Sequence, residues 1–278
     1  MKRKSSTLIL LLFVFTLFIP GLCASRIPAD LTAIAGKFFN GTTGALVIHD
    51  LKAGTYGRYN PARCAERFSP KSTFKIPNSL FALETGVIDS IDTIMPWDQQ
   101  RDPKQEWWDS FGWSKDHTMR SAIQYSVVWF YQEIARRIGG ERMKKLVNSI
   151  GYGNCDISGP IDQFWLNDTM QISADEQIEF LKKFYLGKLG FSASVTAAVK
   201  EILVRQKEDS YTLSAKTGGG DLKKGKDAGR YVGWYVGYIE KGDQVYFFAL
   251  NIDGPTFEDI RDKRINILRQ VFQELAII

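Results

Sequence analysis

The sequence predicts a mixed α/β (α+β) fold in which an antiparallel sheet is flanked by N- and C-terminal helices and interrupted by a mostly helical subdomain. Two observations predict it: strand-like runs occur near both ends of the chain, and the middle shows helical periodicity and loops. A helical insertion of this size leaves room for a cleft beside the sheet, which is a usual place for a ligand site. We expect a single domain over residues 25–278, with its α/β part at about 25–75 and 205–278 and its helical part at about 76–204.

The composition is that of a globular protein with a large core. The chain has 278 residues, of which 44% are apolar and 24% are charged, and this balance argues against a disordered chain. No basic run is interleaved with aromatic residues, so nucleic acid is not an expected partner. The sequence has no Cys-x-x-Cys pattern and no cluster of His and Cys, so we expect no metal site.

The first 24 residues have the pattern of a secretory signal peptide. A basic start, Lys2 to Lys4, precedes an apolar run from Leu8 to Ile19, which is too short for a stable membrane span. Cleavage after Cys23 or Ala24 would remove three of the 36 basic residues and none of the 31 acidic ones, leaving a nearly neutral chain. We therefore expect a protein exported to a bacterial periplasm.

The N-terminal elements follow from local patterns. Gly44 to Leu51 is a β-rich run that ends at a turn signal, and short strands are expected at Tyr56–Tyr59 and Arg63–Phe68. An apolar, helix-like run then leads to Gly86. Because Pro77 has no backbone N–H, we expect that helix to be irregular or kinked there.

The middle of the chain is predicted to be helical and the end to return to strands. Met119 to Ile138 is predicted to form one helix, and Ser173 with Glu176 has the spacing of a capping box before another. The helix that follows the capping box is expected to run to Tyr185. Further helices are expected at Glu141–Ile150, Ala193–Val204 and Ile260–Leu275. Further strands are expected at Tyr211–Lys216, Tyr231–Ile239 and Gln244–Ile252.

Ser72 and Lys75 are the first candidate site residues. Residues three apart on a helical turn share a face, so the amine is expected to lie close enough to the hydroxyl to take its proton. This matters because the chain has only two histidines, His49 and His117, and no G-x-S-x-G pattern, so a serine hydrolase here would need lysine as its base. We interpret both histidines as structural.

Two further patterns follow in a fixed order. Ser126 opens a Ser-x-Val pattern in the helical section, and Lys216-Thr217-Gly218 ends a predicted strand. A lysine and a hydroxyl beside a glycine suit a ligand carboxylate lying along a strand edge, because glycine lets the ligand approach the backbone closely. Each pattern alone is common, and the order Ser-x-x-Lys, Ser-x-Val, Lys-Thr-Gly is the informative observation.

With these patterns the chain resembles the penicillin-recognising serine enzymes, and within them the class D (oxacillinase-type) serine β-lactamases. The resemblance runs from about Gly44 to the C-terminus, and a valine at position 128, where other branches usually carry asparagine, favours class D. The motifs that carry it are Ser72-Thr73-Phe74-Lys75-Ile76-Pro77-Asn78, Ser126-Val127-Val128, Tyr152-Gly153-Asn154, Phe164-Trp165-Leu166, Lys216-Thr217-Gly218 and Gly233-Trp234-Tyr235-Val236-Gly237.

The resemblance implies hydrolysis of the β-lactam ring and gives roles to four residues. Ser72 would be the nucleophile that becomes acylated. Lys75 would be N-carboxylated by carbon dioxide or bicarbonate, with no other cofactor, and would act as general base in acylation and deacylation. Ser126 would relay a proton toward the lactam nitrogen, assisted electrostatically by Lys216.

The resemblance also implies supporting and substrate-binding residues. Val128 and Phe74 would help form the apolar wall around Lys75, and the indole N–H of Trp165 would bind its carbamate. Thr217 and Gly218 would bind the substrate carboxylate together with an arginine of the last helix, for which Arg264 fits best and Arg261 is the alternative. The backbone N–H groups of Ser72 and Gly219 would form the oxyanion hole.

Several alternatives stay open. A covalent β-lactam sensor or a penicillin-binding D,D-peptidase shares the Ser-x-x-Lys and Lys-Thr-Gly patterns but would acylate without efficient turnover. The expected partners are small β-lactam substrates, and the protein is expected to be a monomer or a homodimer. Cys64 and Cys155 are either paired or two isolated thiols.

Overall fold

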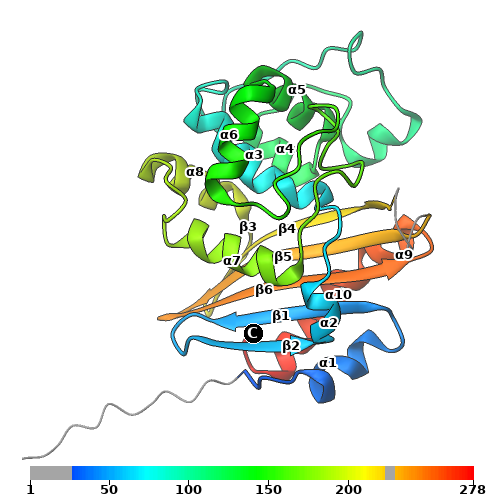
Figure 1. Ribbon diagram of the computed structural model, residues 1–278, viewed down its shortest axis with the longest axis vertical. Coiled ribbons are helices and arrows are strands. Elements are labelled where there is room, and N and C mark those ends of the chain that lie inside the picture. Colours follow the sequence, from blue (N-terminus) through cyan, green and yellow to red (C-terminus); the bar gives the residue numbers. More distant parts are fainter. Residues whose placement is uncertain (1–26, 223–228) are drawn as a thin grey trace, which may run out of the picture.

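The computed structural model describes residues 27–222 and 229–278, and the expected signal peptide lies outside them. A six-stranded antiparallel sheet in the order β2-β1-β6-β5-β4-β3 runs through the lower half of the molecule in Figure 1. The strands are β1 (Gly44–Asp50), β2 (Thr55–Tyr59), β3 (Val204–Lys207), β4 (Thr212–Asp221), β5 (Tyr231–Lys241) and β6 (Gln244–Gly254).

Both faces of the sheet are covered, because alternate residues of its central strands enter two different cores. On β1, Ala45 and Val47 pack into the core shared with the helical subdomain, whereas Leu46 and Ile48 pack into the core on the opposite face. Every residue of β1 is buried, which explains why this strand is an unbroken apolar run rather than an alternating one.

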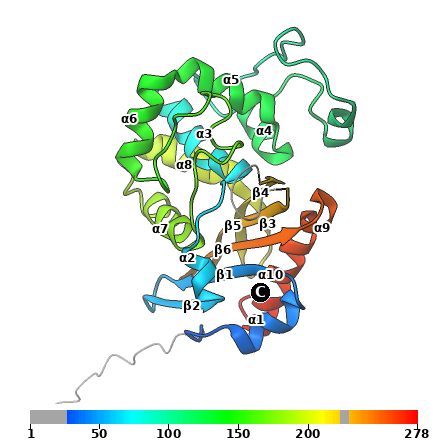
Figure 2. The ribbon, with the colours of Figure 1, turned by 45° about the vertical axis from the view of Figure 1, so that its right-hand side comes forward.

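Helices from the two ends of the chain flank the sheet, as expected, and they share one of its faces. Helix α1 (Thr32–Phe39) packs against α10 (Lys263–Glu274), and α9 (Phe257–Arg261) packs on β4, β5 and β6. Figure 2 shows these helices on the side of the sheet away from the helical subdomain. The antiparallel sheet flanked by terminal helices is confirmed.

The opposite face carries the helical subdomain, which lies above the sheet in Figure 1, and the short helix α2, which lies beside β1 and β2. Helix α7 packs directly on β6 and β1, while α3 contacts α5 and α8 above it. The capping box of Ser173 and Glu176 is present at the start of α7. The elements are α2 (Pro61–Ala65), the 3₁₀ turn η1 (Lys71–Phe74), α3 (Lys75–Glu84), the 3₁₀ turn η2 (Glu106–Phe111), α4 (Met119–Tyr125), α5 (Val128–Ile138), α6 (Gly140–Ile150), α7 (Ala174–Tyr185) and α8 (Ala193–Leu203).

Two local predictions are wrong. The expected single helix over 119–138 is two helices, because Ser126 adopts a left-handed conformation with φ of 58° between α4 and α5. The expected strand at 63–68 begins as helix α2, which Asn60 caps by accepting a hydrogen bond from the Arg63 N–H. Pro77 lies in the first turn of α3, where backbone N–H groups have no intrahelical partner, and α3 continues past it to Glu84.

The described helices are all too short or too polar to cross a bilayer. Cys64 and Cys155 are both free thiols, so the pairing that the sequence left open does not occur. His49 and His117 are buried; His49 stacks on Tyr56, and His117 shares hydrogen bonds with Ser121 and the Gly112 carbonyl. These contacts agree with structural roles for both histidines.

Candidate active site

Ser72 and Lys75 meet where η1 passes into α3. The Nζ atom of Lys75 lies 2.8 Å from the Ser72 Oγ, as the i, i+3 spacing predicts. Ser72 keeps 9% of its surface exposed and Lys75 only 1%, so a substrate can reach the hydroxyl while the amine stays dry. The pair therefore has the geometry of a nucleophile beside its base.

Burial sets the protonation of Lys75. It lowers the pKa of this amine from 10.5 to about 7, because burial removes the hydration of the ammonium. The Tyr131 ring also faces the amine, with its centroid 5.3 Å from Nζ. A large fraction of the amine is therefore uncharged near neutral pH, the form that accepts a proton and that reacts with carbon dioxide.

Trp165 closes this pocket against the residue that precedes Lys75. Its ring stacks on Phe74 with centroids 5.4 Å apart, and Phe164 meets the same ring edge-on at 5.1 Å. The indole Nε1–H of Trp165 is buried and has no hydrogen-bond partner among the described residues. An orphaned buried donor on the ring that stacks against Phe74, the neighbour of Lys75, fits a group that supplies acceptor oxygens, so the residues present suit a carboxylated Lys75.

A second serine and lysine form the other half of the site. The Lys216 Nζ lies 3.0 Å from the Ser126 Oγ, although 90 residues separate them in the chain. Burial lowers the pKa of Lys216 well below 10.5, and the positive charges of Arg205, Lys75 and Arg264 lower it further. Lys216 also donates to the Thr217 carbonyl at 2.9 Å, which fixes its direction.

The edge of β4 beyond Lys216 faces the nucleophile turn. Strand β3 pairs with β4 only at Thr212 to Ser214, so no described strand covers Ala215 to Asp221 on that side. Gly218 lies so close to η1 that a Cβ there would sit 2.8 Å from the Pro70 carbonyl oxygen. A glycine is therefore required for this strand to approach Ser72.

The last helix supplies one buried arginine to this edge. Arg264 donates to the Gly218 carbonyl, and a Cβ on Gly219 would lie 2.7 Å from its Nη1. Burial lowers the pKa of Arg264 to about 10, so it stays charged at neutral pH. The alternative, Arg261, is largely exposed and lies over the Phe111 ring. The structure brings Arg264 to the predicted site and leaves Arg261 at its rim.

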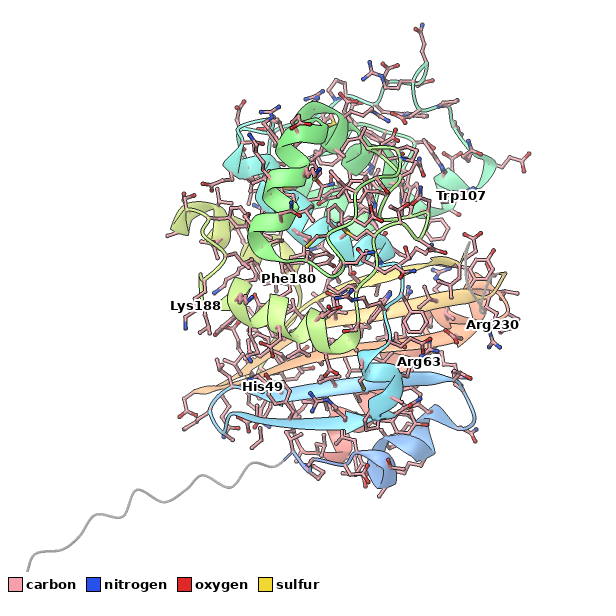
Figure 3. The ribbon with its side chains drawn as sticks, viewed as in Figure 1. His49, Arg63, Trp107, Phe180, Lys188 and Arg230 are labelled. Atoms are coloured by element: carbon pink, nitrogen blue, oxygen red, sulfur yellow. The ribbon has the colours of Figure 1, made fainter. Side chains whose placement is uncertain are left out.

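The Ser126 turn is braced from the helical subdomain. Val127 is fully buried and Val128 is half-buried against the same core, so both hold the turn that carries Ser126. The Nε1–H of Trp113 donates to the carbonyl of Tyr125 at 2.9 Å. The exposed Trp107, labelled in Figure 3, contacts Trp113 and extends this aromatic cluster to the surface.

The sequence prediction missed two cations beside the predicted residues. Lys71 is buried directly before the nucleophile and pairs with Asp168. Arg205, at the start of β3, is hydrogen-bonded to Gln124 and raises the positive potential at Lys216. Neither lies in a recognisable motif, and a lysine beside a serine usually indicates solvent exposure, so only the fold reveals them.

Comparisons with known proteins agree with this geometry. Residues 39–275 match the penicillin-binding protein transpeptidase domain. The chain is 41% identical to β-lactamase OXA-48 of Klebsiella pneumoniae over 219 residues, which cover 79% of this chain and 78% of that protein. The solved structure of the class D β-lactamase FUS-1 (OXA-85) of Fusobacterium nucleatum subsp. polymorphum superposes with a TM-score of 0.82 at 35% identity, covering 88% of this chain and 98% of that one.

A similar protein of a different kind is the regulatory protein BlaR1 of Bacillus licheniformis. It is 34% identical over 243 residues, which cover 86% of this chain but only 37% of BlaR1.

Proposed function

The chain belongs to the class D β-lactamases, within the penicillin-binding transpeptidase family, and on that premise we propose that it hydrolyses the β-lactam ring of penicillin-type antibiotics through a serine acyl-enzyme, conferring antibiotic resistance. The observation that carries the proposal is the convergence of two serine–lysine pairs, Ser72 with Lys75 and Ser126 with Lys216, beside the uncovered edge of β4.

Acylation uses both pairs. Lys75 takes the proton of Ser72 as its Oγ attacks the lactam carbonyl carbon, and the backbone N–H groups of Ser72 and Gly219 stabilise the negative charge that develops on the carbonyl oxygen. The C–N bond then breaks, and Ser126 relays the proton taken from Ser72 to the departing nitrogen. Lys216, whose Nζ lies 3.0 Å from the Ser126 Oγ, orients that hydroxyl for the relay.

Deacylation requires a base for water. Carboxylation of Lys75 by carbon dioxide, in which the neutral amine forms an N–C bond and releases a proton, supplies a carbamate for that purpose. The low pKa of Lys75 makes the neutral amine available, and the orphaned Nε1–H of Trp165 would donate to the added oxygens. Phe74 keeps that indole in place by stacking.

The substrate carboxylate lies along β4 in this proposal. Thr217 offers its hydroxyl, Gly218 allows close approach, and Arg264 supplies a buried positive charge whose Nε has no hydrogen-bond partner among the described residues.

Arg264→Met is expected to raise KM for benzylpenicillin by about 10- to 100-fold, because a charge-assisted contact to the carboxylate is typically worth about 1.5–3 kcal/mol. The matched control is Arg261→Met, which removes an arginine only three positions away whose side chain is exposed. Steady-state kinetics measure both. An equal rise in KM for the two variants would contradict the assignment.

Trp165→Phe is expected to leave acylation nearly unchanged and to slow deacylation by about 10- to 100-fold, as losses of groups that hold a catalytic ligand typically do. Phenylalanine keeps an aromatic ring against Phe74 and removes the indole N–H. Intact-protein mass spectrometry during turnover should show the acyl-enzyme accumulating in the variant. An acyl-enzyme fraction no higher than that of the wild-type protein would disconnect Trp165 from the base.

The proposed function is tested by β-lactam turnover in degassed buffer and again with added bicarbonate. Steady turnover that rises with bicarbonate supports a hydrolase with a carboxylated lysine. A stoichiometric burst without turnover, unaffected by bicarbonate, would favour a covalent sensor, the candidate suggested by the similarity to BlaR1. If the protein formed no covalent adduct with the β-lactam, both the hydrolase and the sensor proposals would be overturned.

We also propose that residues 1–24 direct export to the periplasm and are then removed, as their basic and apolar pattern indicates. The mass of the protein recovered from the periplasmic fraction tests this, because retention of the full-length mass in the cytosol would contradict export. Light scattering would decide between monomer and homodimer.

A further inference from the structure

Lys71, the residue before the nucleophile, makes contacts that the mechanism above does not use. Its ammonium pairs with Asp168 at 3.0 Å, and both side chains are only 2% exposed. The same ammonium donates to the carbonyl oxygens of Leu166 and Asp221, each at 2.6 Å. Lys71 thus joins three segments: the nucleophile turn, the loop after Trp165 and the end of β4.

The backbone reinforces the same junction. The Lys71 N–H donates to the Trp165 carbonyl at 3.1 Å, and the Ser69 hydroxyl donates to that carbonyl at 2.9 Å. The stem of Lys71 also lies along β4, since a Cβ on Gly220 would be 3.4 Å from its Cδ. The loop that carries Trp165 is therefore tied to the nucleophile turn at its backbone and to the sheet through Lys71.

Lys71 has an unfavourable backbone conformation. Its φ is 49°, in the left-handed region that side chains other than those of Asn and Asp rarely adopt, whereas Asp168, with φ of 66°, is a residue that tolerates this region. Such a conformation at a lysine persists where the surroundings hold it, and such residues gather at functional sites. Here the strained lysine is the residue that pairs with Asp168 and contacts the Trp165 carbonyl.

A second buried ion pair, Arg63 with Asp253, differs from the Lys71–Asp168 pair in the segments that it joins. Arg63 pairs with Asp253 and also donates to Asn251, joining α2 to β6. Arg63 lies beside the sheet at α2 in Figure 3, and its polar contacts are to strand residues. Its role is accounted for by the fold, whereas Lys71 contacts the Trp165 loop and the end of β4 beside the nucleophile.

We propose that the Lys71–Asp168 pair is a positioning device that fixes the Trp165 loop to the rigid sheet, and thereby holds the indole N–H where the base at residue 75 needs it. This inference rests on the proposed function. Lys71 touches no reacting atom; it acts through Trp165. The loop is the part that is held, and β4 is the anchor.

The variant that tests this is Lys71→Met/Asp168→Asn. It removes both charges together, so no unpaired charge remains buried, and asparagine tolerates the left-handed backbone at 168. The matched control is Arg63→Met/Asp253→Asn, which removes the other buried pair in the same way. Asp168→Asn alone serves if the double variant does not fold.

Two readouts separate positioning from a merely structural role. Amide hydrogen exchange over residues 163–170 should speed up in the Lys71→Met/Asp168→Asn protein and stay at the wild-type rate in the control. The bicarbonate concentration that gives half-maximal turnover should rise by about tenfold, the lower end of the usual effect of losing a partner that orients a catalytic group. The single-turnover acylation rate should change by less than about threefold, because the Ser72–Lys75 geometry is intact.

The outcomes are distinguishable from failure of the proposed function. Wild-type loop exchange and wild-type bicarbonate dependence in the Lys71→Met/Asp168→Asn protein would overturn the positioning role while leaving the function in place. An equal rise in the half-maximal bicarbonate concentration of the Arg63→Met/Asp253→Asn control would also overturn the positioning role. Loss of any buried ion pair would then be enough to produce the effect. Wild-type turnover that ignores bicarbonate would instead overturn the carboxylated base, and with it the catalytic purpose of the pair.

Discussion

Ser72→Ala is expected to abolish the covalent adduct with benzylpenicillin and to reduce turnover by a factor on the order of 10⁴ or more, as loss of a serine nucleophile does in other hydrolases. The reason is local: the Ser72 Oγ is the atom that Lys75 faces at 2.8 Å, and alanine leaves the amine with no hydroxyl to activate. Intact-protein mass spectrometry after mixing with benzylpenicillin measures the adduct, and absorbance of the lactam measures turnover.

The matched control for this change is Ser79→Ala, which removes a hydroxyl one helical turn beyond Lys75. That hydroxyl is buried and donates to the Lys75 carbonyl at 2.8 Å, so its loss tests whether any nearby serine matters. The control should still be acylated at its nucleophile. A covalent adduct in the Ser72→Ala protein would place the nucleophile elsewhere and contradict the site.

The sequence could predict the contacts that depend on short-range geometry and on motif order. The approach of Lys75 to Ser72 follows from helical spacing alone. That Ser126 meets Lys216 does not follow from spacing; it was predicted because the three patterns occur in a known order. Strands β5 and β6 were found nearly in full, because long apolar, β-rich runs are strong local signals.

What could not be predicted depends on tertiary contacts. The run from 119 to 138 has continuous helical periodicity, yet it is interrupted at Ser126, where the Trp113 indole binds the preceding carbonyl. The local sequence predicts a surface lysine at position 71, and only folding brings the Asp168 carboxylate and two carbonyl oxygens to it. A local sequence pattern cannot predict contacts with residues that are so distant in the chain.

The electrostatics of the cleft follow from the gathering of cations in a dry place. Arg205 and Arg264 contribute positive charge around Lys216 on β4, and burial is the first cause of the lowered pKa of both arginines and of Lys75 and Lys216. Such a site favours an anionic substrate, and it favours the uncharged form of its lysines. The same burial therefore supports both carboxylate binding and proton transfer.

Lys75→Met is the sharpest test of that argument, because methionine keeps an apolar stem in the pocket and removes only the amine. Turnover is expected to fall by a factor on the order of 10⁴ or more. In the wild-type protein the amine holds its proton below about pH 7 and loses it above, so turnover should rise with pH through that value.

The pH profile separates this lysine from the others. Lys200→Met is the control, because Lys200 is also partly buried with a lowered pKa, but it donates to the Tyr185 carbonyl, and neither residue lies at the site. The Lys200→Met protein should keep the wild-type rise near pH 7, and the residual turnover of the Lys75→Met protein should lack it. If the rise survived in the Lys75→Met protein, the titrating base would be another group, and Lys216, which faces Ser126 from β4, would become the residue to replace next.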